Sequence, residues 1–222
     1  MLDDAAVRDE TCDELITTST AVIRRAAVSS MDNNAYLVTC SVTGDQLLVD
    51  AADDAPRLLA MIEDGGGPLT HLVTTHRHQD HTRALAAVVS ALHPVVAAGE
   101  DDADALPVPV DLRLRHEDDL PVGRLRLRVV HLRGHTPGSV TVVLPGDPAA
   151  GQPDRLFTGD SLFPGGVGRT WSPDDFDSLF QDVQTRIFDA FDDDTVVHPG
   201  HGLPTTLGAE RPHLGEWRSR GW

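Results

Sequence analysis

The order of apolar and polar residues in the first half of the chain predicts early strands, a hairpin and a helix. Apolar and β-branched residues dominate positions 14–28, which indicates strands. Runs at 35–40 and 46–50 flank the Gly44-Asp45 turn and predict a hairpin. Residues 55–63 follow with Pro56 near their start and three glycines after their end, a pattern typical of a helix.

The same alternation of strand and helix continues to residue 97. Leu72-Val73-Thr74 predicts a short buried strand. Residues 85, 88, 89 and 92 are all Leu or Val and recur at i, i+3, i+4 and i+7, so we expect a helix with all four facing the core. Residues 95–97 predict another short strand.

Strand patterns dominate the second half. We expect strands at 112–114, 124–132, 140–144 and 155–158, and a final buried strand at 195–197. Arginine alternates with apolar residues along 124–129, which predicts one face exposed to solvent. Apolar residues at helical spacing over 176–191 predict a long helix, and residues 207–222 predict a short helix and cap.

Composition narrows the class of protein. With 222 residues, 40% hydrophobic and 24% charged, the chain fits one soluble globular domain, residues 1–222. The formal charge of −17 repels phosphate backbones, so we expect no nucleic-acid partner. We find no secretory signal and no run of membrane-spanning length, and expect a cytoplasmic protein without a membrane partner. Cys12 and Cys40 are expected to be ordinary thiols, and the acidic runs 100–102 and 192–194 solvated loops.

A dense cluster of ligand-type residues follows the strand at 72–74. Its sequence is Thr75-His76-Arg77-His78-Gln79-Asp80-His81. Alternation along an extended chain would place His76 and His78 on one side, and Asp80 and His81 follow where the chain turns. Imidazole and carboxylate together suit zinc, iron or manganese. The cluster therefore predicts a metal site at the end of this strand.

Three later loops repeat the arrangement of a strand followed by a ligand-type residue among glycines. They place His135 in Gly134-His-Thr-Pro-Gly-Ser139, Asp160 in Thr158-Gly-Asp-Ser-Leu-Phe163, and His201 in Pro199-Gly-His-Gly202. The glycines let the backbone turn sharply and approach a metal closely. Asp50 also ends a strand, but we expect it to be structural, and we expect His198 to be a packed histidine.

These four motifs, in this order, resemble the metallo-β-lactamase superfamily and, within it, the glyoxalase II-like hydrolases. The resemblance covers about residues 33–207. It implies an α/β fold, an αββα sandwich of two mixed sheets flanked by helices, with the metals at the sheet edge. By position, it implies a first metal held by His76, His78 and His135. It implies a second metal held by Asp80, His81 and His201, with Asp160 bridging the two.

The resemblance also implies a function. It is that of a hydrolase of small acyl thioesters with two divalent ions, zinc or alternatively iron or manganese, which lower the pKa of a bridging water to about 7. Asp80 would orient this nucleophile as well as bind metal, and a thiolate leaves without help from an acid. Arg169 is either a substrate-binding residue or part of a salt bridge that organises its loop. Persulfide dioxygenases, with one iron at the positions of His76, His135 and Asp160, resemble the sequence almost as well and are the alternative.

Differences from other branches of the superfamily support the resemblance to the glyoxalase II-like hydrolases. Zinc β-lactamases lack the bridging Asp, and flavo-diiron proteins carry Glu where His78 stands. Lactonases that cleave acyl-homoserine lactones use a downstream Tyr, whereas the only tyrosine here is Tyr36, upstream of the cluster. Glyoxalase II binds glutathione through a C-terminal helical extension, whereas 21 residues follow His201 in this sequence. We therefore expect no strong demand for glutathione as the thiol.

Overall fold

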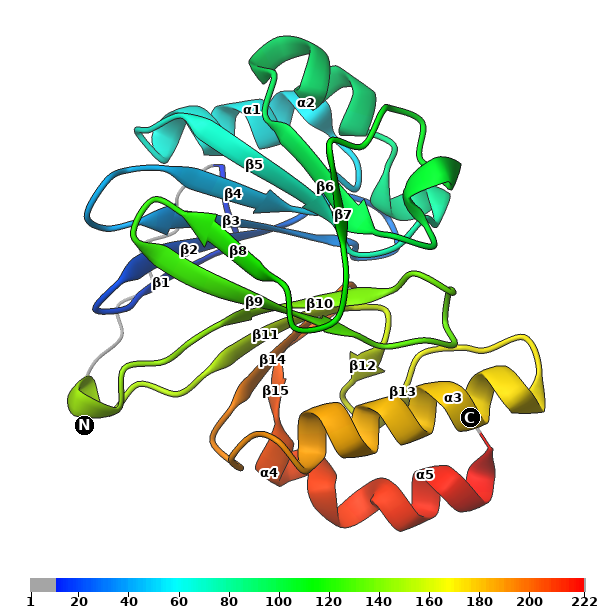
Figure 1. Cartoon of the computed structure of the whole chain (residues 1–222). Coiled ribbons are helices and arrows are strands. Elements are labelled where there is room, and N and C mark those ends of the chain that lie inside the picture. Colours follow the sequence, from blue (N-terminus) through cyan, green and yellow to red (C-terminus); the bar gives the residue numbers. More distant parts are fainter. Residues whose placement is uncertain (1–10, 222) are drawn as a thin grey trace.

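Two β-sheets face each other, and helices cover their outer faces (Figure 1). The structure, a computed structural model, describes residues 11–221. Helices α1 and α2 lie on the outer face of one sheet, and α3 and α5 lie outside the other (Figure 1). This is the αββα sandwich that the family resemblance implies.

The first sheet contains the predicted strands of the N-terminal half. Its strands are hydrogen-bonded in chain order, antiparallel from β1 to β4 and parallel from β4 to β7. They are β1 (Glu14–Thr17), β2 (Ala21–Ala27), β3 (Asn34–Cys40), β4 (Gln46–Val49), β5 (Leu69–Thr74), β6 (Val95–Gly99) and β7 (Leu112–Leu114).

The second sheet contains the strands of the C-terminal half in the order β15-β14-β11-β10-β9-β8. Only β11 and β14 pair in parallel. The strands are β8 (Asp119–Val122), β9 (Leu125–His131), β10 (Val140–Leu144), β11 (Arg155–Gly159), β14 (Val196–Pro199) and β15 (Thr205–Thr206). A separate ribbon pairs β12 (Leu162–Phe163) with β13 (Gly166–Val167).

The sequence patterns did not predict four short strands. Strand β8 contains Pro121 and begins at Asp119, which weakens its signal, yet Leu120 and Val122 face the core. The two-residue strands β12, β13 and β15 are too short to show alternation. The expectation that 195–197 is the final strand was wrong, because β15 follows β14 and pairs with it.

The helices begin and end at recognisable signals. Ser172 caps α3 by accepting a hydrogen bond from the Asp175 N–H, and Asp54 caps α1 in the same way through the Arg57 N–H. The ranges are α1 (Ala55–Asp64), α2 (Leu85–Leu92), α3 (Pro173–Val183), α4 (Leu207–Glu210) and α5 (Leu214–Arg220). Helix α3 continues into a π-helical turn over Gln184–Phe188.

One helix expectation was wrong in part. Leu85 and Val88 of α2 are buried and Val89 is partly buried, but Leu92 is 39% exposed. The helix ends at Leu92, and His93 follows in the left-handed conformation. The last turn therefore carries Leu92 away from the sheet that α2 covers.

Apolar side chains form three layers. Alternate residues of one strand enter different layers, so Val73 of β5 packs between the sheets while Leu72 packs under α1 and α2. The third layer joins the second sheet to α3 and α5 and includes Phe180 and Trp217. The arginine-rich start of β9 does have an exposed face, as predicted. Within residues 11–221 no helix is long and apolar enough to span a bilayer.

Candidate metal centre

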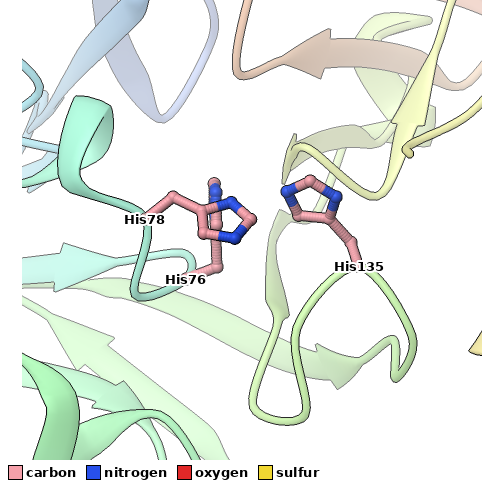
Figure 2. A group of neighbouring side chains, drawn as sticks. All are labelled: His76, His78 and His135. Carbon is pink, nitrogen blue, oxygen red and sulfur yellow. The ribbon is translucent and has the colours of Figure 1, made fainter. Parts of the chain in front are cut away.

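Three histidines meet at the edge where the two sheets come together. His76 and His78 lie in the loop after β5, and His135 reaches toward them from the loop between β9 and β10 (Figure 2). Their ring centroids are 4.6–4.8 Å apart in each pair. One nitrogen from each ring lies within 4.8 Å of the others, which is a spacing that one ion can bridge.

A second group of ligand-type atoms adjoins the first. Asp80, His81 and His201 bring one ligand atom each to within 4.8 Å of the others. His81 comes from a short 3₁₀ turn, Gln79–His81, and His201 comes from the loop between β14 and β15. The His201 Nε2 lies 3.3 Å from the Asp80 Oδ2. This group therefore also combines residues from both sheets.

Asp160, which follows β11, lies between the two groups. Its carboxylate oxygens are 3.3 Å from the His81 Nε2, 3.4 Å from the His201 Nε2 and 3.7 Å from the His135 Nε2. It thus contacts both groups at once. The structure brings together all seven residues that the sequence singled out, namely His76, His78, Asp80, His81, His135, Asp160 and His201.

Hydrogen bonds on the far side of three imidazoles fix their orientation. The Nδ1 of His135 bonds the Arg169 carbonyl at 2.7 Å, and the Nδ1 of His201 bonds the Met31 carbonyl at 2.8 Å. A carbonyl can only accept, so each Nδ1 carries a proton and Nε2 is the ring nitrogen that faces the cluster. The Nδ1 of His81 lies 2.9 Å from the Asp50 carboxylate, with the same consequence.

Three buried ligand atoms have no hydrogen-bond partner among residues 11–221. They are the Nε2 of His76, the Nε2 of His135 and the Oδ1 of Asp160. Buried polar atoms are nearly always hydrogen-bonded, because an unpaired one costs about 1–3 kcal/mol. The three atoms belong to residues that contact one another in the centre of the cluster. Their chemistry and position fit metal ions, which would satisfy them.

A glycine makes the close approach of the loops possible. A Cβ on Gly200 would lie 2.2 Å from the Asp160 Oδ1 and 2.8 Å from the His81 Cε1. Any larger residue would therefore collide with two of the ligand side chains. At this position the glycine permits the close approach of backbone and ligand side chains.

The two groups differ in their electrostatics. Burial lowers the pKa of His76, His78 and His135, so these imidazoles are neutral. Burial also lowers the pKa of His81, but the Asp160 and Asp50 carboxylates outweigh it and raise that pKa to about 10.

The remaining members of the second group follow the same logic. Burial lowers the pKa of His201, but the Asp160 carboxylate outweighs burial, so the net pKa is raised above its ordinary value. Burial raises the pKa of the Asp160 carboxyl, but the imidazoles of His201 and His81, at 3.4 and 3.3 Å from its oxygens, outweigh burial and hold that pKa well below its usual range. Without metal, the second group is therefore a network of charged partners.

Two residues beside the cluster gain roles that the sequence did not assign. Asp50, expected to be structural, is buried and accepts hydrogen bonds from the Thr75 N–H and hydroxyl as well as facing His81. The Asn33 side-chain amide donates to the Asp80 Oδ2 at 3.0 Å and lies 3.3 Å from the His201 Nε2. The available signals were an Asp at a strand end and an Asn before a strand, and neither is specific.

The expectation that the acidic run 100–102 is a solvated loop was wrong for one of its residues. Asp102 was expected in a solvated loop, but its side chain is fully buried. It accepts hydrogen bonds from the N–H groups of Arg77 and Gly138 at 3.1 Å each and from the Thr136 hydroxyl. It therefore ties the loop of His76 and His78 to the loop of His135. The other acidic run, residues 192–194, is exposed as predicted.

Two further expectations concern His198 and Arg169. His198 is packed, as expected: it is buried, its ring stacks on Phe157, and burial lowers its pKa to about 3. The suggested salt bridge of Arg169 is not formed with any carboxylate of residues 11–221. Its guanidinium instead lies 4.7 Å from the centroid of the Trp171 ring.

A cavity of about 610 Å³ opens beside the cluster. His135, Asp160 and His201 are among the residues that line it. Apolar side chains and a glycine-rich segment form the rest of its wall, with Arg169 and Arg220 also present. A substrate in this cavity would lie directly against the ligand cluster.

Sequence and structure comparisons define the family. The model of the metallo-beta-lactamase superfamily matches residues 31–201, and the chain belongs to this superfamily. The hydroxyacylglutathione hydrolase of Rhodopseudomonas palustris (strain BisB18) is 38% identical over 63% of this chain and 52% of that protein. The chain spans between half and two thirds of the length of the curated hydrolases that it matches.

Solved structures agree with this placement. The crystal structure of ETHE1 from Myxococcus xanthus matches with a TM-score of 0.77 and 28% identity, over 89% of this chain and 84% of that one. Another structure, of a protein in a di-iron-bound form, matches with a TM-score of 0.69 and 31% identity, over 84% of this chain and 96% of that one.

Proposed function

We propose that this protein is a metal-dependent hydrolase of small acyl thioesters. The observation that carries the proposal is the convergence of seven His and Asp side chains, with three buried ligand atoms that lack hydrogen-bond partners. The similarity to hydroxyacylglutathione hydrolases supports the reaction class. Zinc suits this set of imidazole and carboxylate ligands, and the di-iron form of one structural relative makes iron the main alternative.

The proposed ligands divide between two ions. His76, His78 and His135 would hold the first, Asp80, His81 and His201 the second, and Asp160 both. When bound, such a pair of ions supplies Lewis acidity and lowers the pKa of water to about 7. The Nδ1 contacts of His81, His135 and His201 direct each Nε2 toward Asp160 and the centre of the cluster, where the ions would bind.

Asp80 is the proposed orienting carboxylate. Burial raises its pKa, but the Asn33 amide and His81 outweigh burial and bring the pKa below its ordinary value. Asp80 is therefore ionised at neutral pH. Its Oδ2 accepts the Asn33 hydrogen bond, which leaves Oδ1 to accept from an attacking water. A thiolate needs no proton from the enzyme to leave, so the absence of a further acid from this scheme is no obstacle.

Arg169 is the proposed contact for an anionic part of the substrate. Its side chain is exposed at the cavity and rests on the face of Trp171, while its carbonyl holds His135. Because the carbonyl belongs to the backbone, replacing the side chain by Gln leaves the His135 bond in place. Arg169→Gln would then raise KM for anionic thiol carriers more than it lowers kcat.

The test combines metal analysis with kinetics. Protein purified without added metal is analysed for zinc, iron and manganese, and its steady-state hydrolysis of lactoyl-glutathione is compared with that of thioesters of other small thiols. We expect two divalent ions per chain, hydrolysis of several thioesters, and a raised KM in Arg169→Gln but not in Arg126→Gln, on the outer face of β9. Oxygen uptake on glutathione persulfide by an iron-containing protein that hydrolyses no thioester would refute the proposal and favour the dioxygenase.

A further inference from the structure

The cavity beside the ligand cluster has an apolar character that the proposed reaction alone does not require. Met31, Phe163, Pro164 and Val167 contribute its hydrophobic side chains. Among the described residues that line it, no side chain carries a hydroxyl or an amide. Apart from the two arginines, Arg169 and Arg220, and the candidate ligands, the lining side chains therefore offer a hydroxylated or peptide-like substrate group no hydrogen bond to replace those it loses to water.

Several backbone N–H and C=O groups of the cavity wall already have hydrogen-bond partners within the protein. The Gly165 N–H donates to the Glu210 carboxylate at 2.9 Å, and the Gly165 carbonyl accepts from the Arg220 guanidinium at 2.8 Å. The Gly168 N–H donates to the Ser161 carbonyl, and strands β12 and β13 pair with each other. The segment thus offers its surface to a ligand mainly through nonpolar contact.

The apolar wall reaches the proposed reaction centre. The Phe163 ring centroid lies 6.4 Å from that of His201, whose Nε2 faces Asp160. Met31 approaches from the other sheet, where its carbonyl holds His201. A substrate arm next to these side chains would be continuous with a carbonyl placed at the ligand cluster.

We propose that the cavity binds an apolar arm of the substrate, so that the preferred thioesters carry a hydrocarbon chain. This inference rests on the proposed thioesterase activity and specifies its substrate class. The volume of about 610 Å³ is many times that of a lactoyl group and lies in the usual range for ligand cavities. The arm is either the acyl chain or the thiol chain, and the two are separable by experiment.

Two series of substrates test the proposal. One series extends the acyl chain from acetyl to octanoyl on a constant thiol, N-acetylcysteamine, and includes the lactoyl thioester. The other extends the thiol at constant acetyl. We expect kcat/KM to rise about fourfold per buried methylene in one series only, and lactoyl to be a poorer substrate than butanoyl. A flat dependence in both series would overturn the proposal.

Matched variants locate the effect in the cavity. Phe163→Ala removes part of the wall and should flatten the dependence on chain length, and Met31→Ala should do so without changing the carbonyl that holds His201. Leu203→Ala is the control, because Leu203 is 70% exposed and lies two residues after His201 but does not line the cavity. Metal content is measured for each variant. An unchanged dependence in both cavity variants would contradict the proposal.

A binding measurement separates this proposal from the proposed reaction. Ketone analogues, in which a methylene replaces the thioester sulfur, cannot be hydrolysed, and calorimetry gives their affinity for the metal-replete protein. Affinity that rises with chain length supports the apolar cavity even if no thioester is hydrolysed, in which case only the proposed reaction fails. Affinity that is independent of chain length, together with rapid thioester hydrolysis, would refute the cavity proposal alone.

Discussion

The two ligand groups on either side of Asp160 are built from similar side chains but differ in charge. His76, His78 and His135 are neutral because burial lowers each pKa. Their counterparts His81 and His201 have raised pKa values, because Asp160 faces both of them and Asp50 also faces His81. The first group is therefore ready for a cation, whereas the second is held together by protons that a cation must displace.

The largest expected effect comes from removing the residue common to both groups. Asp160→Ala should lose both proposed ions and lower kcat/KM by about a thousandfold or more, because several kcal/mol of charge stabilisation disappear. His201→Ala should weaken only the second ion. Chelator competition and metal analysis measure both variants. Equal loss of metal in the two would mean that Asp160 serves one group only.

The two ligand groups should also differ in how their metal affinity depends on pH. A raised pKa means that His81 is protonated at neutral pH, so affinity at the second group rises as pH increases toward about 10. Between pH 8 and pH 6 we expect this affinity to fall by up to about tenfold per pH unit. The pKa values of the first group are lowered rather than raised, so its affinity should change less over that range. Two binding steps with the same pH slope would contradict the comparison.

We expect a smaller loss of metal affinity when the buried carboxylate that supports each ligand group is replaced. Asp50→Asn weakens the acceptor of the His81 Nδ1–H and should reduce affinity about 10–100-fold at the second group. Asp102→Asn disturbs the contacts to Arg77 and Gly138 and should act on the first group, more weakly. Chelator competition again gives the two constants. Gln46→Met, which removes buried hydrogen bonds to Ile62 and Gly67 at the opposite end of β4 from Asp50, controls for loss of stability.

The sequence predicted the centre well because its residues lie in short motifs. Each candidate ligand follows a strand whose apolar run is readable, and the carboxyl ends of β5, β11 and β14 lie at one edge of the sandwich. The main strands and helices followed from the same patterns, whereas the arrangement of the strands in two sheets followed from the family resemblance. The family resemblance supplied what spacing could not, namely which ligands share an ion.

The residues that support the ligands were harder to predict because their contacts are distant in sequence. Asp102 sits in an acidic run that resembles a solvated loop, yet it meets Thr136 and Gly138 more than thirty positions later. Asn33 meets His201 across 168 positions. Such contacts depend on how two sheets pack, and no local pattern encodes that. The exposure of Leu92 also depended on where α2 ends relative to the sheet.

The only tyrosine in the chain offers an optical report on the joint between the sheets. The Tyr36 hydroxyl, on β3, donates to the Pro199 carbonyl at 2.7 Å, two residues before His201. Burial raises the pKa of this phenol far above its ordinary value, so it stays un-ionised while the sheets remain together. At or above about pH 10, where an exposed tyrosine ionises, tyrosinate absorption would therefore arise only from molecules whose β3 and β14 have separated. One chromophore thus allows the opening of the two halves to be timed without any added label.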